Sequence, residues 1–187
     1  MQVEGGNITL IIGPMFSGKS TYLLNYVRKL SYTGAKTVFV NHSIDNRYTS
    51  NGSICTHEQE TVNAISCNTL GEKMEELEKY DIIGIDEGQF FSDLVDVSEK
   101  LCLQGKTVAV AALSGDFRMK PFPNIAELLS KANKIKLMKA FCFYCHKEAA
   151  FSLRTVKSEK KILVGSAESY KPVCRNCYYK YNQSETV

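Results

Sequence analysis

A glycine-rich segment near the start of the chain combines residue types that together bind phosphate. Gly13 is followed by four other residues and then by Gly18-Lys19-Ser20, which is the Walker A pattern. Glycines let successive backbone N–H groups converge on an oxyanion at the positive end of a helix, so few side chains are needed. An ordinary glycine-rich turn is the alternative. We expect a nucleoside triphosphate to bind this loop through Gly13, Pro14, Met15, Phe16, Ser17, Gly18, Lys19, Ser20 and Thr21.

Two acids in mid-chain are the second candidate for chemistry. Asp86 and Glu87 end an apolar run, and an aspartate at the end of a strand is the Walker B arrangement, which holds Mg²⁺ together with the hydroxyl of Ser20. Lys19 is expected to reach the β- and γ-phosphates. Because side chains alternate along a strand, Glu87 points away from Asp86 unless the chain has turned, so Glu87 is available as a proton acceptor. The alternative is that Glu87 only caps the following helix or orders Gly88 and Gln89.

Four cysteines in two C-x-x-C pairs predict a structural zinc site with Cys142, Cys145, Cys174 and Cys177 as its ligands. Redox-active dithiols are the alternative, but neither pair has a thioredoxin-like context. The other cysteines, Cys55, Cys67 and Cys102, are expected to be buried apolar residues. Residues 149–170 must loop out between the two pairs, with strand-like pieces at 150–153 and 162–164. This segment is either a tethered flap that excludes water from a kinase site or an exposed hairpin without a role.

The elements that position these groups alternate along the chain. Periodicity and turn residues predict strands at 8–12, 37–41, 80–87, 106–113 and 135–141. Helices are expected at 20–30, 70–77, 92–103 and 124–132, with Ser92 capping the third. This order predicts an α/β fold of the P-loop, RecA-like type, with a doubly wound, mainly parallel sheet. We assign residues 1–141 to this domain and residues 142–187 to a small zinc-binding domain.

Composition limits the class of protein. The 187 residues are 44% hydrophobic and 23% charged, with a formal charge of +3, as in an ordinary globular protein with one core and a small satellite. The basic residues are spread along the chain, so we expect no nucleic-acid partner. The first residues lack the pattern of a signal peptide and no apolar run is long enough to span a bilayer, so we expect a cytoplasmic protein without a membrane partner.

Taken together, the motifs resemble those of the cellular-type, or type II, thymidine kinases of animals, bacteria and poxviruses. The resemblance runs over residues 7–178. It rests on the loop at 13–21, on Asp45-Asn46-Arg47-Tyr48, on Asp86-Glu87-Gly88-Gln89-Phe90-Phe91, on Lys120-Pro121-Phe122 and on the paired cysteines. Three positions depart from the family pattern. The last zinc ligand is Cys177, where some animal members use histidine. Ser166 follows Gly165 where many relatives have a second glycine, and Ser114 stands where aspartate is common.

This resemblance implies the transfer of the γ-phosphoryl group of ATP to the 5′-hydroxyl of thymidine, and also of deoxyuridine. Glu87 would accept the hydroxyl proton. The sequence alone leaves Asp45 and Arg47 as either loop residues in solvent or ligand contacts, whereas the resemblance places Arg47 near the transferred phosphate and Asp45 with the nucleotide. The nucleoside would lie against Met15, Phe90, Leu113, Phe117, Phe122 and Ser152, and against a lasso that includes Leu163, Val164, Gly165 and the sugar contact Tyr170.

The resemblance also implies a homotetramer that thymidine triphosphate inhibits. Two other classes of function stay open on the residues alone. One is an ATPase stimulated by nucleic acid, in which Glu87 orients water and the zinc knuckles hold the strand. The other is a nucleotide-binding scaffold without catalytic activity.

Overall fold

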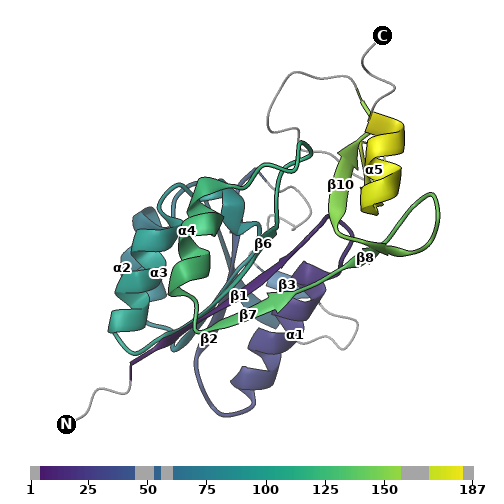
Figure 1. The fold of residues 1–187 in the computed structure, drawn as a ribbon. Coiled ribbons are helices and arrows are strands. Elements are labelled where there is room, and N and C mark those ends of the chain that lie inside the picture. The colour runs from purple at the N-terminus through teal and green to yellow at the C-terminus, as the bar shows by residue number, and fades with distance from the viewer. Residues whose placement is uncertain (1–4, 45–52, 56–60, 157–168, 183–187) are drawn as a thin grey trace.

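A seven-stranded sheet forms the centre of the computed structural model, which describes residues 5–44, 53–55, 61–156 and 169–182 (Figure 1). Its strands are β1 (Asn7–Gly13), β2 (Thr37–His42), β3 (Ser53–Cys55), β4 (Thr61–Cys67), β5 (Ile82–Ile85), β6 (Thr107–Leu113) and β7 (Lys134–Leu137). They lie in the order β3-β4-β2-β5-β6-β1-β7. Every neighbouring pair is parallel except β3 with β4.

Helices cover both faces of this sheet. They are α1 (Lys19–Ser31), α2 (Met74–Leu77), α3 (Leu94–Leu103) and α4 (Pro123–Lys131), with short 3₁₀ turns at Gly71–Lys73 and Gly88–Phe90. In Figure 1, α1 lies on one side of the sheet and α2, α3 and α4 lie on the other. The α/β fold with a doubly wound, mainly parallel sheet is therefore confirmed.

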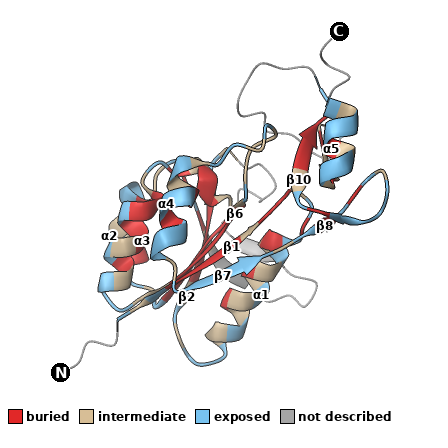
Figure 2. Cartoon of the chain, viewed as in Figure 1, coloured by how far each residue is buried: buried red, intermediate tan, exposed pale blue. Residues whose placement is uncertain are grey.

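The sheet has a hydrophobic core on each of its two faces, because successive side chains along a strand point to opposite faces. Ile8 and Leu10 of β1 point to the side of α3 and α4, where they join Leu101 and Leu128 in the larger core. On the α1 side, Ile11 packs in a second core with Leu23, Val27, Phe39 and Ala109. Apolar residues are buried on both faces of the central strands, as expected for a parallel sheet covered by helices (Figure 2).

A smaller unit follows the sheet. It consists of β8 (Ala140–Phe141), β9 (Glu148–Ala149), β10 (Phe151–Arg154), β11 (Tyr170–Val173) and α5 (Arg175–Asn182). The pairs β8/β9 and β10/β11 are antiparallel. A third cluster of buried residues belongs to this unit and includes Ala149, Leu153, Val173 and Tyr178. In Figure 1 the unit lies beyond the end of β1, on the side where the phosphate loop begins.

Several expected elements differ in the structure. The strand expected at 135–141 is divided, because β7 pairs with β1 only as far as Leu137 and the chain then leaves to form β8. The helix expected at 70–77 is a 3₁₀ turn followed by the single-turn α2. Ser92 does not cap α3, which begins at Leu94 after Asp93. The carboxylate of Asp93 instead accepts hydrogen bonds from the N–H groups of Leu70 and Gly71 (3.2 and 2.7 Å).

Two predictions about the free cysteines have different outcomes. Cys67 is buried, and burial, followed by the nearby acids Glu72 and Asp93, raises the pKa of its thiol to about 12. Cys102 is only half-buried on α3, because this position of the helix lies at the margin of the core. The side chain of Cys55 lies outside the part of the chain whose side chains are described.

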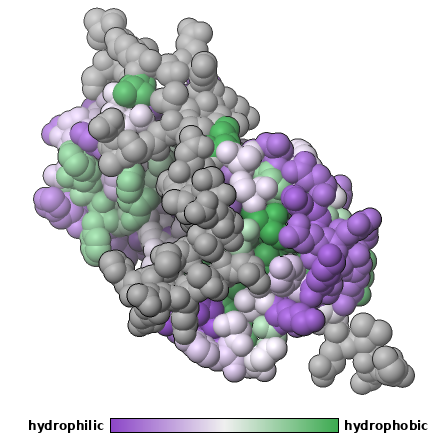
Figure 3. Space-filling view, turned by 180° about the vertical axis from the view of Figure 1, so that it is seen from behind, coloured by the Kyte–Doolittle hydropathy of each residue, from purple (hydrophilic) through white to green (hydrophobic). Residues whose placement is uncertain are grey.

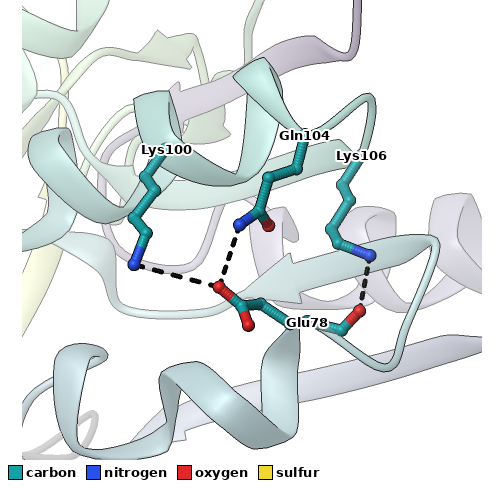
Figure 4. Close-up of polar contacts among 4 residues, drawn as sticks. All are labelled: Glu78, Lys100, Gln104 and Lys106. Atoms are coloured by element: carbon teal, nitrogen blue, oxygen red, sulfur yellow. Dashed lines mark hydrogen bonds and ion pairs between the residues drawn. The ribbon is translucent and has the colours of Figure 1, made fainter.

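The surface over α2 and α3 is strongly polar. Seen from behind, hydrophilic side chains gather on this side of the molecule (Figure 3). Glu78 accepts a hydrogen bond from Gln104 (2.9 Å) and lies 3.8 Å from the ammonium group of Lys100, while Lys106 donates to the backbone carbonyl of Glu78 (Figure 4). Among the described residues, no helix is both long enough and apolar enough to cross a membrane.

Candidate active site

The glycine-rich loop connects β1 to α1 at the carboxyl edge of the sheet. Gly18, directly before α1, has φ 78°, a left-handed conformation that glycine adopts at little cost. The side chain of Lys19 is 8% exposed, and its Nζ donates to the backbone carbonyl of Pro14 (2.7 Å). The hydroxyl of Ser17 donates to the same carbonyl (2.9 Å). The side chain of Lys19 is therefore held inside the loop by a hydrogen bond to the backbone of the loop itself.

Position 13 needs a glycine because there is no room for a side chain, and not because the backbone has a positive φ. A Cβ atom at this position would lie 2.6 Å from the backbone oxygen of Met138 and 2.8 Å from the Ser17 hydroxyl. Because Met138 donates its N–H to Ile12, the neighbouring backbone is fixed and cannot move aside. The remaining expected loop residues differ in exposure: Pro14 is buried, Met15 and Ser20 are half-buried, and Phe16, Gly18 and Thr21 are exposed.

The acidic pair follows β5, which ends at Ile85. Asp86 is 1% exposed, and its N–H donates to Val40 of the neighbouring strand (2.8 Å). Glu87 has left-handed backbone angles (φ 52°, ψ 40°), which are uncommon for a residue other than glycine. Its N–H donates to the Asp86 carboxylate (2.9 Å). The chain thus turns immediately after Asp86, so the direction of Glu87 is not fixed by strand alternation.

Gln89 links the acidic pair to the phosphate loop; the sequence analysis named it only within a motif and gave it no role in the site. Its Nε2 donates to Glu87 (2.5 Å), and its Oε1 accepts the N–H of Leu113 at the end of β6 (3.1 Å). Leu113 lies level with Gly13 in the β1/β6 pairing, and the N–H of Ser114 donates to the Gly13 carbonyl (3.2 Å). A continuous series of contacts therefore leads from Glu87 to the first glycine of the loop.

A residue of α4 stabilises the 3₁₀ turn Gly88–Phe90, which follows the acidic pair. The side-chain amide of Asn124 donates to the carbonyls of Gly88 and Phe91 (3.2 and 2.8 Å). Phe91 is fully buried in the main core, whereas Phe90 is half-buried at the edge of the site. His42, at the end of β2, packs against both rings, with centroids 5.8 Å from Phe90 and 4.8 Å from Phe91. Burial in this setting lowers the pKa of His42.

The small C-terminal unit reaches the loop through Ser152. Its hydroxyl accepts the backbone N–H of Met15 (2.9 Å), and the serine is buried. Arg154, two residues after Ser152, covers the ring of Phe117 with its guanidinium group (3.7 Å to the ring centroid). The carbonyl of Phe117 accepts the Tyr178 hydroxyl of α5 (2.8 Å). Arg154 also donates to the Tyr170 hydroxyl.

The sequence did not single out Arg154, Tyr178 or Asn124. For Arg154 a signal existed, because it lies two residues after Ser152 and therefore on the same face of a strand. Phe122 immediately precedes α4 and packs on the main core. The predicted residues Asp45, Arg47, Leu163, Val164 and Gly165 lie outside the described part of the chain.

The four paired cysteines come together between β8 and α5. Their Sγ atoms all lie within 4.8 Å of one another, and those of Cys145 and Cys174 are 3.6 Å apart. Four thiolates around one Zn²⁺ at the usual Zn–S distance lie about 3.8 Å apart, so these residues have the type and spacing of a closed, four-thiolate metal site.

A glycine-rich loop between a strand and a helix, with an acidic pair at the same edge of a parallel sheet, defines a P-loop nucleotide-binding protein of the α/β class. The fold resembles that of flagellar accessory protein FlaH from Methanocaldococcus jannaschii (TM-score 0.56, 12% identity, covering 89% of this chain and 84% of that one), a likeness in fold alone. The model of the family "Thymidine kinase" matches residues 6–178.

Named relatives agree with this match. The chain is 44% identical to thymidine kinase 1 of Dictyostelium discoideum, over 92% of this chain and 78% of the relative. It is 42% identical to the thymidine kinase of Variola virus (94% and 98% of the two chains) and 43% identical to that of Sheeppox virus (95% and 99%). The chain belongs to the thymidine kinase family and is an enzyme of the kinase class, which confirms the resemblance found in the sequence.

Proposed function

We propose that this protein transfers the γ-phosphoryl group of ATP to the 5′-hydroxyl of thymidine, and also accepts deoxyuridine. The observation that carries this proposal is the series of contacts from Glu87 through Gln89 and Leu113 to Gly13. It brings a carboxylate to the same strand ends as a phosphate-binding loop. A carboxylate beside a bound triphosphate is what an acceptor hydroxyl needs in order to lose its proton during transfer.

The loop residues hold the triphosphate in this proposal. Backbone N–H groups of the loop at residues 13–21 bind the phosphate oxygens, except at Pro14, which has none, and at Met15, whose N–H donates to Ser152. Lys19 exchanges its contact with the Pro14 carbonyl for one with the phosphates. Ser20 and Asp86 are the ligands for Mg²⁺, which when bound neutralises charge on the β- and γ-phosphates. Asp45 and Arg47 complete the nucleotide side, with Arg47 near the group that is transferred.

Glu87 is the proposed general base. Its turned backbone frees it from the strand, and Gln89 fixes the position of its carboxylate. The nucleoside then lies against Met15, Phe90, Leu113, Phe117, Phe122 and Ser152, and is covered by the lasso residues Leu163, Val164, Gly165 and Tyr170. Support for this pocket comes from the contacts of Ser152 with Met15 and of Arg154 with Phe117 and Tyr170.

The remaining parts of the proposal concern assembly and regulation. The four cysteines hold a structural Zn²⁺ that fixes both ends of the lasso, and residues 142–187 form a domain of their own. We further propose a cytoplasmic homotetramer inhibited by thymidine triphosphate. An exposed sheet edge supports self-association: β7 is the last strand of the described sheet, and Ile135 and Leu137 on it are 48% and 61% exposed.

Replacing Glu87 by glutamine tests the proposed reaction. We expect thymidine monophosphate formation to fall by about a hundredfold or more, while ATP still binds, because the proton acceptor is lost and the loop is not. Glu127→Gln, on the exposed face of α4, is the matched control and should retain full activity. ADP release by the wild-type protein that is independent of thymidine, without any monophosphate, would disprove the proposal.

A further inference from the structure

Arg154 is a buried cation in the small C-terminal unit. It ends β10, its side chain is only 7% exposed, and it lies on the same face of that strand as Ser152, which contacts the phosphate loop. Burying a guanidinium group is costly unless its N–H groups and its charge are satisfied. Two of the contacts that Arg154 makes, with Tyr170 and with Phe117, indicate a role for this residue.

Tyr170 is directly opposite Arg154 in the β10/β11 pairing. Both the Nε and the Nη2 of Arg154 donate to the Tyr170 hydroxyl oxygen, at 3.2 and 2.8 Å. A phenol oxygen has two lone pairs and carries one hydrogen. The hydroxyl oxygen therefore accepts from two N–H groups of one rigid, planar guanidinium group, which fixes where this oxygen lies.

The flat face of the same guanidinium group covers Phe117. The distance from the Arg154 Cζ to the ring centroid is 3.7 Å, which is within the range of a cation–π contact. Phe117 is also held by its carbonyl, which accepts the hydroxyl of Tyr178. The edge of the guanidinium group thus fixes Tyr170 while its face fixes Phe117. A lysine, whose ammonium group has no plane, cannot make both contacts in this way.

We infer that Arg154 is a positioning residue of the nucleoside site: it holds the Phe117 ring in place and fixes the position of the Tyr170 hydroxyl beside the bound nucleoside. The inference rests on the proposed function, in which Phe117 and Tyr170 contact the nucleoside. It adds a residue that does not itself contact the substrate and acts through two that do.

The test compares Arg154→Met, Tyr170→Phe and the double variant. We measure the KM for thymidine and for ATP, kcat, and thymidine binding by calorimetry without turnover. Because a hydrogen bond to a charged group is lost, Arg154→Met should raise the thymidine KM and Kd about tenfold or more and leave the ATP KM within about twofold. In the double variant the combined effect should be smaller than the product of the two single effects, since part of the effect of Arg154 acts through Tyr170. Arg154→Lys should give an intermediate KM.

Arg175→Met is the matched control. Arg175 also lies over an aromatic ring of this unit (4.7 Å from the centroid of Phe151), but it is exposed and the ring that it covers is not part of the proposed nucleoside site. It should keep the wild-type thymidine KM. If Arg154→Met fails to fold, as judged by its thermal transition and ATP binding, Arg154→Lys carries the comparison.

Two results would overturn the inference. One is a thymidine KM within twofold of wild type in the folded Arg154 variant, and the other is a double variant whose effect equals the product of the single effects. Both leave the proposed function intact, because the wild-type protein still makes thymidine monophosphate. The absence of that product from the wild-type reaction would instead remove the proposed function.

Discussion

The backbone N–H of Met15 in the phosphate loop donates to the hydroxyl of Ser152, although the two residues are 137 positions apart in the chain. This bond joins the nucleotide-binding loop to the strand β10 of the cysteine-bearing unit. The same strand carries Arg154, which contacts Phe117 and Tyr170. A change in the small unit can therefore reach the loop directly through one hydrogen bond.

Removing this hydroxyl is the first prediction. Ser152→Ala leaves the Met15 N–H without its buried partner, which should lower the free energy of unfolding by about 1–2 kcal/mol. We also expect the thymidine KM to rise several-fold. Urea denaturation and steady-state kinetics measure the two effects. Ser130→Ala, which removes an exposed hydroxyl from α4, should change neither quantity. Equal effects of the two substitutions would contradict a specific role for the bond between Ser152 and Met15.

The second prediction concerns Gln89. Gln89→Met removes the donor to Glu87 and the acceptor for Leu113, so kcat should fall about tenfold or more because the carboxylate is no longer held in place. ATP affinity should be nearly unchanged. Gln104→Met is a close control, since Gln104 also donates to a glutamate, Glu78, but does so in the exposed polar cluster over α2 and α3 (Figure 4).

Single-turnover kinetics distinguish a loss in the chemical step from slower product release in these variants. If Gln89→Met has the kcat of the wild-type protein, Glu87 does not depend on Gln89 for its position. If Gln104→Met loses as much activity as Gln89→Met, the effect is one of general stability.

The sequence predicted the central strands well because their side chains are buried on both faces. Runs such as 10–12 and 108–113 are continuously apolar, which is typical of a parallel sheet covered by helices. The strand β4 was not predicted. It includes the polar residues Asn63 and Ser66, and only its pairing with β2 and β3 shows it to be a strand. β11 was also missed, since Pro172 in its middle argues against a strand unless the strand lies at an edge.

The parts of the candidate site that belong to a local sequence motif could be predicted. The contacts that form only when distant segments come together in the fold could not be predicted. The loop at 13–21 and the four cysteines are local patterns, and the structure brings the cysteines together. Gln89 and Arg154 act across strands, through Leu113 and Tyr170, and no local pattern encodes such partners. The roles of the predicted catalytic and substrate-binding residues, and the division of the chain at residue 141, stay predictions.

The third prediction concerns the metal. Cys177→Ser should reduce bound zinc from about one equivalent per chain to well below one, measured by elemental analysis, because a hydroxyl is a poor replacement for a thiolate. We expect the unit that contains β10 and α5 to lose stability, since metal-binding energy contributes to its folding. Tyr178, which holds the Phe117 carbonyl, is the next residue, so the thymidine KM should rise as well. Cys102→Ser, outside the cluster, should retain its zinc. Full zinc occupancy in Cys177→Ser would contradict the four-thiolate site.

The fourth prediction is a dependence of stability on pH that originates at His42. Burial lowers the pKa of this imidazole below its ordinary value of 6.5, and the Asn68 backbone, Asp93 and Glu72 oppose the shift. Its Nδ1 accepts the N–H of Ile44 (3.1 Å), a bond that protonation removes. Because the unfolded chain takes up a proton at a higher pH than the folded chain, the free energy of unfolding should fall as pH decreases through about 6.5 and be unaffected by this group well above it.

Urea denaturation at pH 7.5 and pH 5.5 checks this prediction. His42→Phe keeps a ring against Phe90 and Phe91 but cannot be protonated, so the loss of stability between the two pH values should be smaller than in the wild-type protein. His146→Asn changes an exposed histidine and should keep the wild-type loss. An identical loss in His42→Phe and in the wild-type protein would show that other groups are responsible. For each protein, the quantity to compare is the change in the free energy of unfolding between pH 7.5 and pH 5.5. His42→Phe also alters packing, which shifts the stability at both pH values and so cancels in this difference.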